Sequence, residues 1–264
     1  MPIRLTPAVV SDIGPHRTSN QDAAFTASWG AAVADGVGGG PSGDLASAAL
    51  VHRLVPGPLR IDEPEELLAR IREANWDLGA HVRRDPSLQG MATTFTGIFV
   101  TPSDRLLLAH TGDSRAYVLR HAQLLRQTRD DSYVQALVDS GLLAPEAAAS
   151  HPRRNIITAS LGGGEEDVIS VAEREPVLGD RWLLCSDGVS DYVDDEEIGL
   201  TLLRHRDVWS AAAALVALAL DSGSRDNVTA VVCDVVEGPA DLSEAAAFAG
   251  SAAERFQEHL DVIA

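Results

Sequence analysis

The stretch TTFTGIFVTPSDRLLLAHTGDSRAYVLR, residues 93–120, decides the fold class of this chain. It contains three runs of apolar, β-branched and aromatic residues, joined by the short links TPSD and GDS. Links of this length and composition are typical of hairpins, and a hairpin pairs its two strands antiparallel. The stretch therefore predicts a meander of antiparallel strands.

Helical patterns lie on both sides of this meander, and Asp62 followed by Pro64 predicts the start of one of them. Because regular βαβ alternation is absent, we expect an α+β fold whose antiparallel sheets are covered by helices. The predicted helices are 44–55, 63–84, 131–141, 194–205 and 207–223, and the further strands are 31–35, 167–175, 181–187 and 227–236.

Length and composition limit the classes of function. The 264 residues suffice for one large domain, and the formal charge is −18, with arginine as the only basic residue type. So acidic a surface repels nucleic acid and anionic membranes, and the longest apolar stretch, residues 208–220, is too short and alanine-rich to span a bilayer. Residues 1–14 lack the apolar core of a signal peptide, and Cys185 and Cys233 make no disulfide framework. We therefore expect a cytoplasmic protein that binds no nucleic acid.

The glycine-rich loop ADGVGGGPSGD, residues 34–44, allows two interpretations. Gly38, Gly40 and Gly43 have the spacing of a dinucleotide-binding turn. That turn needs a βαβ unit with a parallel sheet, whereas the next convincing strand begins only near Thr93. Asp35 would also place a negative charge beside the pyrophosphate, and a Walker loop is excluded because the chain has no lysine. The loop is better explained by a metal bound to its acid.

Asp35 is one of five aspartates that end or begin a β-type run beside a small or polar residue; the others are Asp22, Asp113, Asp187 and Asp226. Each alone is typical of a turn. Together they could converge at one end of a pair of sheets, where several carboxylates need cations. Oxygen ligands without histidine or cysteine select Mg²⁺ or Mn²⁺ rather than zinc.

The ordered series of motifs resembles the metal-dependent protein phosphatases of the PP2C type (PPM family), in their compact bacterial form. The resemblance implies a four-layer α-β-β-α sandwich of two antiparallel sheets and hydrolysis of phosphoserine and phosphothreonine in proteins. It assigns 1–238 to the phosphatase domain, with a flap at about 129–165, and leaves 239–264 as an Ala- and Glu-rich, helical C-terminal appendage. The motifs are SDIGPHRTSNQD, VADGVGGG, ATTFTG, AHTGDSRAYVLR, LLCSDGVSDYV and SRDNVTAVV, within residues 11–236.

The resemblance also implies a metal ligand set. Asp35 matches the acid that bridges two core metals, and Gly36 matches the residue whose carbonyl binds the first. Asp187 and Asp226 match ligands of the second metal. Asp22 matches the acid that steadies the waters of the first metal.

Two further matches concern substrate and a third ion. Asp113, with Asp187, matches the pair that holds a third metal in bacterial members, and Arg17 matches the clamp on the substrate phosphate. Two Mn²⁺ or Mg²⁺ ions would generate hydroxide that attacks phosphorus in line, while the ions and Arg17 offset charge on the phosphoryl oxygens. The residues implied in catalysis are Arg17, Asp35 and Asp187.

One departure from the family pattern leaves a second function open. Gly40 stands where the family usually has a histidine, its proposed proton donor to the leaving alcohol. The alternative to an active phosphatase is a catalytically weak relative that binds phosphoproteins. For either function we expect partners phosphorylated by a cognate serine/threonine kinase, and we expect a monomer.

The missing donor predicts a substrate preference. General acid catalysis contributes about 10²–10⁴-fold, and p-nitrophenolate leaves well without a proton whereas a serine alkoxide does not. Gly40→His should therefore raise kcat on phosphoserine peptides more than on p-nitrophenyl phosphate. His16→Ala tests whether His16, beside Arg17, supplies the proton instead, by selective loss of peptide activity. Equal changes on both substrates for Gly40→His would contradict the missing-donor interpretation.

Overall fold

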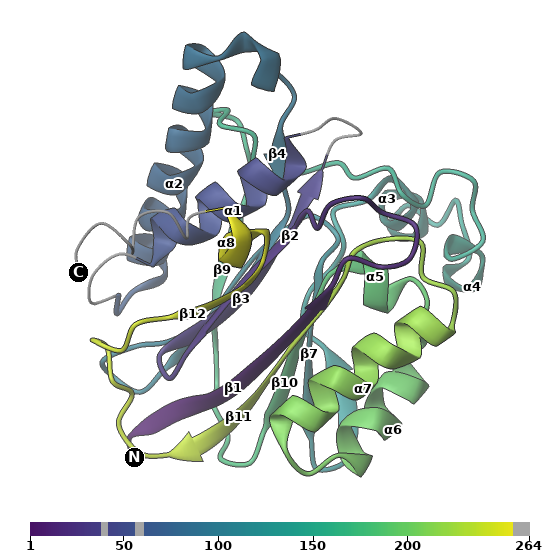
Figure 1. Cartoon of the computed structure of the whole chain (residues 1–264). Helices are drawn as coiled ribbons and strands as arrows, with labels where there is room; N and C mark the ends of the chain where they lie inside the picture. Colours follow the sequence, from purple (N-terminus) through teal and green to yellow (C-terminus); the bar gives the residue numbers. More distant parts are fainter. Residues whose placement is uncertain (38–41, 56–60, 256–264) are drawn as a thin grey trace.

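The computed structural model describes residues 1–37, 42–55 and 61–255, which form two facing antiparallel sheets with helices on both outer sides (Figure 1). The first sheet has five strands in the order β1–β11–β10–β7–β8. Their bounds are β1 (Ile3–Asp12), β11 (Val228–Glu237), β10 (Arg181–Cys185), β7 (Arg115–Arg120) and β8 (Gln123–Arg126).

The second sheet follows the order β12–β2–β3–β5–β6–β9, and the short strand β4 pairs beside this path with β3. Every strand pair in the two sheets is antiparallel. The bounds are β12 (Ala247–Gly250), β2 (Asp22–Ala27), β3 (Gly30–Val37), β4 (Ala92–Thr93), β5 (Phe95–Val100), β6 (Leu106–Thr111) and β9 (Ser170–Arg174).

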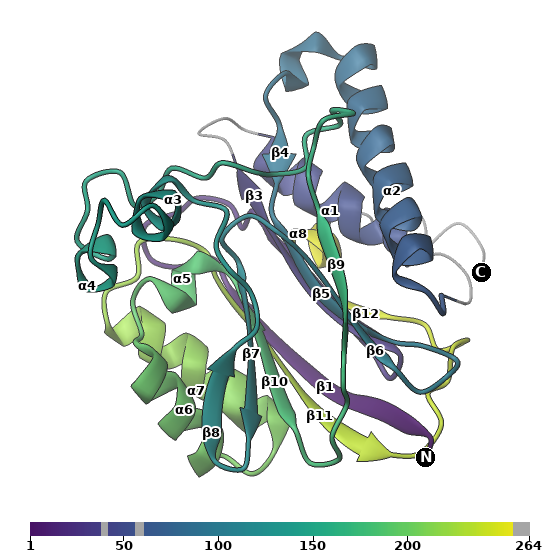
Figure 2. The same ribbon diagram turned by 180° about the vertical axis from the view of Figure 1, so that it is seen from behind.

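Helices complete the four layers that the motif resemblance implies. Helices α1 and α2 cover the second sheet, and α6 and α7 cover the first (Figures 1 and 2). Helices α3, α4 and α5 lie near one end of the sandwich (Figure 2). The bounds are α1 (Gly43–Leu54), α2 (Pro64–Arg84), η1 (Pro86–Leu88), α3 (Tyr133–Asp139), α4 (Pro145–Ala148), α5 (Asp187–Ser190), α6 (Asp195–Arg204), α7 (Val208–Asp221) and α8 (Ser251–Glu254).

Each sheet is buried on both faces, which explains the continuous apolar runs in the sequence. In β10, Trp182 and Leu184 point toward the other sheet, whereas Leu183 and Cys185 point toward α6 and α7. This alternation follows from the two-residue period of a strand. Burial raises the pKa of the Cys185 thiol to about 12, so this cysteine stays a neutral packing group.

The link between β6 and β7 corrects one sequence prediction. The link TPSD does form a hairpin between β5 and β6, but GDS does not, because β6 and β7 belong to different sheets. Gly112 has φ of 98°, and a Cβ there would lie 2.6 Å from Cγ2 of Thr94. The glycine thus lets the chain turn sharply from one sheet to the other, which places Asp113 at the crossing.

Two helix predictions also differ from the structure. Helix α2 begins with a capping box between Glu63 and Glu66, so its N-cap is Glu63 rather than Asp62. In the described part of the C-terminal segment, residues 247–250 form strand β12 on the edge of β2, and residues 251–254 are helical. The free edge of β2 offers backbone hydrogen bonds that an isolated helix could not use. Residues 256–264 of the predicted appendage lie outside the described residues.

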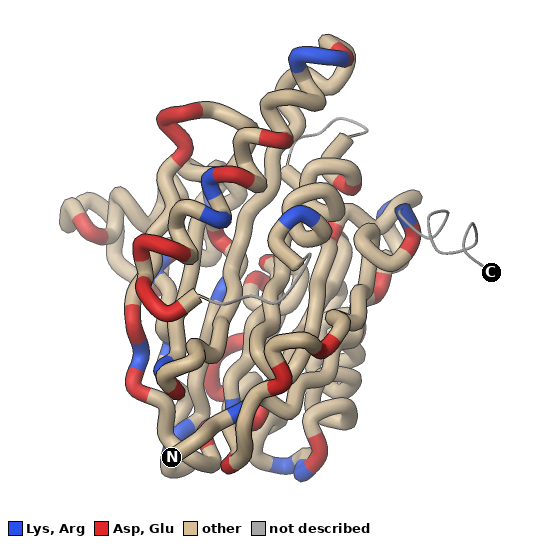
Figure 3. The backbone as a smooth tube through the Cα atoms, turned by 90° about the vertical axis from the view of Figure 1, so that its left-hand side faces the viewer, with Lys and Arg blue, Asp and Glu red and all other residues tan. Residues whose placement is uncertain are grey.

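The surface is acidic along loops and helix ends, as Figure 3 shows for one side of the molecule. Most of the charge excess is therefore spread over solvated positions. None of the helices in the described ranges is long and apolar enough to cross a membrane.

Candidate functional site

Five strand ends bring the predicted acids to one rim of the sandwich. Asp22 begins β2 and lies directly opposite Asp35 of β3 in the strand register. Asp113 lies at the crossing from β6 to β7, Asp187 follows β10 at the start of α5, and Asp226 precedes β11. Segments that are far apart in the sequence therefore meet at a single place.

A cavity of about 220 Å³ opens at this rim. It is lined by six of the seven predicted site residues, and Asp22 lies buried behind it. Its lining residues are Arg17, Gln21, Asp35, Gly36, Val37, Asp113, Asn155, Ile157, Asp187 and Asp226.

Asp22 is held by the first sheet although it belongs to the second. Its Oδ2 accepts hydrogen bonds from Oγ of Ser186 at 2.8 Å and from Oγ1 of Thr229 at 2.7 Å. Its Oδ1 is buried and has no hydrogen-bond partner among the described residues. Burial raises the pKa of Asp22 to about 6, even though the two hydroxyls oppose the shift.

The other buried acids repel one another. Burial, followed by repulsion from Asp22 and Asp187, raises the pKa of Asp35 well above its usual value. Burial and repulsion from Asp113 and Asp226 do the same for Asp187, whose Oδ1 also lacks a partner in the described part of the chain. Burial raises the pKa of Asp113 to about 7. These carboxylates are therefore unstable as anions unless positive charge is brought to them.

The donor set fits hard divalent cations. Buried carboxylate oxygens without hydrogen-bond donors, together with backbone carbonyls, are the ligands that Mg²⁺ and Mn²⁺ prefer. Within the described ranges, no three acidic, histidine or cysteine side chains are already gathered around one point as a bound ion would hold them. A bound ion would therefore complete its shell with carbonyl oxygen and water, or draw the carboxylates closer.

Gly36 is required by packing as well as by any ligand role. A Cβ at Gly36 would lie 2.3 Å from the carbonyl oxygen of Gly43, the first residue of α1. A Cβ at Gly43 would likewise lie 2.8 Å from the carbonyl oxygen of Gly36. The two glycines let the start of α1 approach the end of β3 directly beside the cavity.

Arg17 already neutralises one acid of the group. Its Nη2 donates to Oδ2 of Asp226 at 2.6 Å, and its Nε donates to the carbonyl of Arg225 at 3.3 Å. The Arg17 side chain is 43% exposed. It can therefore leave Asp226 without breaking buried packing.

A second hollow, of about 330 Å³, adjoins the first through Asp113 and lies under α3 and α4. Asp191, the C-cap residue of α5, lines this hollow, and its Oδ2 pairs with Nη1 of Arg154 at 2.5 Å. Burial raises the pKa of Asp191. Sequence reasoning missed Asp191, although it follows Asp187 in the motif SDGVSDY, one helical turn later. It also missed Asn155, whose loop carries no pattern that would indicate a site.

The histidines do not form part of the described cavity. His16 is exposed beside Arg17, and the ring of His151 packs near Tyr133, with centroids 6.1 Å apart. Gly38 and Gly40, and with them the missing-histidine position, lie outside the described residues. The dinucleotide interpretation fails independently, because the β3–α1 connection belongs to an antiparallel sheet.

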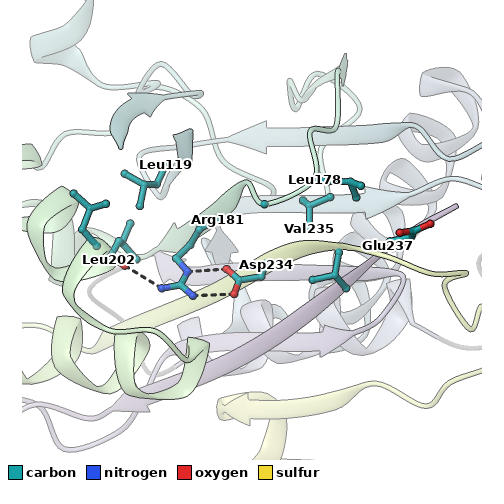
Figure 4. Close-up of a pocket in the computed structure, with 10 residues that line it drawn as sticks. Leu119, Leu178, Arg181, Leu202, Asp234, Val235 and Glu237 are labelled. Carbon is teal, nitrogen blue, oxygen red and sulfur yellow. Dashed lines mark hydrogen bonds and ion pairs between the residues drawn. The ribbon is translucent and has the colours of Figure 1, made fainter. Parts of the chain in front are cut away.

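A larger groove, of about 510 Å³, lies at the other end of β10 and carries no predicted site residue (Figure 4). Arg181 lines it and donates to both carboxylate oxygens of Asp234, at 2.7 and 2.8 Å, and to the carbonyl of Leu202 at 2.9 Å. The guanidinium charge of Arg181 is therefore already paired with the Asp234 carboxylate. The groove's size does not make it the functional site, since no buried acid or base without a partner lines it in the described residues.

Comparison with known proteins agrees with this geometry. The family model for protein phosphatase 2C matches residues 16–224. The serine/threonine protein phosphatase PstP of Mycobacterium tuberculosis is 44% identical over 87% of this chain and 45% of its own length, so the chain spans about half of that relative. The serine/threonine phosphatase Stp of Listeria monocytogenes is 31% identical over 76% of this chain and 82% of its own. A crystal structure of the PstP catalytic domain in complex with two manganese ions superposes with a TM-score of 0.80, at 40% identity, covering 89% of this chain and all of that one.

A two-sheet sandwich that gathers five aspartates at one rim defines an α+β protein with a candidate metal site. The match over most of the chain then makes the assignment specific: the chain belongs to the protein phosphatase 2C family.

The raised pKa values predict how pH affects the metal-free protein. The pKa of Asp22 is about 6 in the fold, against an ordinary value of 3.8. Protonation of Asp22 therefore favours the folded state, and this contribution to stability is complete below pH 3.8 and is lost as the pH rises through about 6. In chelator, the unfolding temperature should fall as pH rises from about 4 to about 7, the span between the ordinary pKa of 3.8 and the raised pKa values of Asp22 and Asp113, and Mn²⁺ should raise it more at the higher pH.

Asp187→Asn removes one repelling charge and should flatten this dependence, whereas the exposed Asp85→Asn should leave it unchanged. The measurement is thermal unfolding of the three proteins with and without Mn²⁺. An equal Mn²⁺ effect at both pH values in the wild type would contradict the prediction.

Proposed function

We propose that this chain is a metal-dependent phosphatase that hydrolyses phosphoserine and phosphothreonine in proteins. The observation that carries the proposal is the set of buried and half-buried carboxylates around one cavity in a chain of this family, two of which have a buried oxygen without a partner in the described residues. The named relatives are serine/threonine phosphatases, and the PstP catalytic domain binds two manganese ions. By analogy we propose Mn²⁺ or Mg²⁺ as the cofactor of this chain.

The chain offers a ligand for each ion that we propose. Asp35 would bridge two core ions, and the carbonyl of Gly36 would bind the first of them. Asp187 and Asp226 would bind the second. Asp22 would steady the waters of the first ion, which suits a carboxylate with one oxygen tied by hydroxyls and the other without a partner.

A third ion is proposed between Asp113 and Asp187. Repulsion from Asp113 is the largest charge effect on Asp187, which supports a cation between them. The adjoining hollow under α3 and α4 also carries Asp191, whose carboxylate is paired with Arg154.

When bound, the two core ions supply an activated water and positive charge beside the phosphoryl oxygens. Arg17 contributes the planar fork that suits two phosphate oxygens at once. Because Arg17 pairs with Asp226, a side chain that we propose as an ion ligand, an ion at Asp226 would release Arg17 toward the substrate. The same arginine would thus neutralise the empty site and clamp the phosphate in the loaded one.

The remaining features of the proposal concern partners and location. We propose substrates phosphorylated by a serine/threonine kinase, action as a monomer, and no binding to nucleic acid, which the charge of −18 disfavours. Cys185 and Cys233 are buried free thiols, which suits a reducing compartment such as the cytoplasm.

Metal-dependent turnover tests the proposal. Hydrolysis of p-nitrophenyl phosphate and of a phosphothreonine peptide should require Mn²⁺ or Mg²⁺ and should stop in chelator. Asp35→Asn and Asp187→Asn should each reduce kcat by about 10²-fold or more, since each removes a charge that orients an ion. Asp85→Asn is the control that should keep full activity. Peptide binding without turnover in the wild type would favour the phosphoprotein-binding alternative, and activity in excess chelator would contradict the two-ion proposal.

The Arg17–Asp226 pair predicts opposite effects on metal and substrate. Arg17→Ala removes a positive charge that competes for Asp226, so Mn²⁺ binding should tighten by up to about fivefold. The same change removes charged hydrogen bonds to phosphate, so KM for a phosphopeptide should rise about tenfold to a hundredfold. Arg53→Ala is a matched control, because Arg53 is similarly exposed and pairs with Asp77 away from the cavity. An unchanged KM in Arg17→Ala would exclude Arg17 as the phosphate clamp.

A further inference from the structure

The C-terminal segment returns from the first sheet to the second and ends beside Asp22. After β11, Glu244 accepts hydrogen bonds from the amide of Ser28 at 2.8 Å and from Nε1 of Trp29 at 3.0 Å. Strand β12 then pairs with β2 in a register that runs toward the cavity, where Gly250 lies opposite Ala23. Figure 1 shows β12 beside β2 and α8 against α1. The segment lies beyond residue 224, where the match to the family model ends.

Ser251 joins this segment to the rim. It is 1% exposed, and its Oγ donates to the carbonyl oxygen of Asp22 at 3.0 Å. The same Oγ lies 3.0 Å from Oγ of Ser47 in α1, which donates to the carbonyl of Gln21 at 2.5 Å. The Gln21 carbonyl also accepts from the amide of Gly36 at 3.1 Å. Two buried hydroxyls thus bond to the consecutive carbonyls of Gln21 and Asp22 at the start of β2.

The approach to Asp22 is possible only through glycine at position 250. Gly250 has φ of 63° and ψ of −144°, and a Cβ there would lie 2.2 Å from the Asp22 carbonyl oxygen. The chain turns at this point from β12 into α8, which brings the Ser251 hydroxyl against Asp22. The backbone conformation at Gly250 therefore fixes the contact between Ser251 and Asp22.

Side-chain contacts fasten the segment to α1. The ring of Phe248 stacks on His52, with centroids 4.1 Å apart, and Nε2 of His52 lies 2.7 Å from the carbonyl oxygen of Ala252. Arg255 pairs with Asp44 through its Nε at 2.7 Å. These contacts hold the segment in place, and the Ser251 hydroxyl connects it to Asp22 through a side-chain hydrogen bond.

We propose that Ser251 is a positioning residue for the metal centre, an inference that rests on the proposed function. The side chain of Asp22 is held by Ser186 and Thr229 of the first sheet, and its backbone is held by Ser251. With both ends held, the orientation of the carboxylate is fixed, including that of Oδ1, which has no hydrogen-bond partner among the described residues. Without the Ser251 hydroxyl, the buried Asp22 carbonyl loses this donor, and the start of β2 is held beside Asp35 by backbone pairing with one contact fewer.

The test is direct Mn²⁺ binding to the full chain, measured from the free-Mn²⁺ electron paramagnetic resonance signal. Ser251→Ala should weaken Mn²⁺ binding about threefold to tenfold, the effect expected for one buried hydrogen bond. Ser251→Thr keeps the hydroxyl and should bind within about twofold of wild type. Ser243→Ala is the matched control on the same segment, since the Ser243 hydroxyl bonds only to the neighbouring, exposed Asp241, and it should have no effect.

Phe248→Leu separates positioning from simple bracing. It removes the stack on His52 but leaves the Ser251 hydroxyl, so it should lower the unfolding temperature while Mn²⁺ affinity stays within about twofold of wild type. Wild-type Mn²⁺ affinity in a folded Ser251→Ala protein would overturn the inference while leaving the proposed function intact. A threefold to tenfold loss of Mn²⁺ affinity in Ser251→Thr, which keeps the hydroxyl, would also overturn the inference. This variant supplies the test if the alanine variant does not fold. Absence of Mn²⁺ binding by the wild type would overturn the proposed function, and this inference with it.

Discussion

Mutual repulsion among buried carboxylates is the constraint on which the rest of this structure depends. Asp22 is buried, and Asp35 and Asp187 are half-buried in the wall of the cavity, where like charges are less well screened than in bulk water. Such a group persists only where cations, donors and a stiff backbone keep it in place. The fold supplies donors from Ser186 and Thr229, but two carboxylate oxygens have no partner in the described part of the chain. The remaining stabilisation must come from positive charge, and this need is what suits the rim to binding divalent cations.

The sandwich provides the stiff backbone. Three apolar layers, one between the sheets and one under each pair of helices, hold the strands that end at the rim. Interiors packed in this way deform little, so the strand ends keep their separation. The crossing at Gly112 and Asp113 matters here because it links the two sheets directly beside the acids. The rim is thus assembled from both sheets rather than from one.

The C-terminal segment extends this arrangement. Strand β12 covers an edge of the second sheet that would otherwise expose unpaired backbone groups. By ending at Ser251 it also connects the helix layer over that sheet to Asp22. A segment outside the matched family region can therefore add stability and precision to a site whose proposed ligands, apart from Asp226, lie inside it.

The sequence by itself determined the antiparallel α+β class, the helices that cover the sheets and the aspartates that share one cavity. These features depend on local periodicity, turn chemistry and motif spacing, which are legible along the chain. Only the tertiary structure decided that the link at Gly112 crosses between sheets, that Arg17 pairs with Asp226, that Asp191 joins the acidic rim and that residues 247–250 form a strand. Each of these features depends on a backbone edge or a charge that is far away in the sequence but close in space. A local sequence pattern does not show which distant segment will lie beside it.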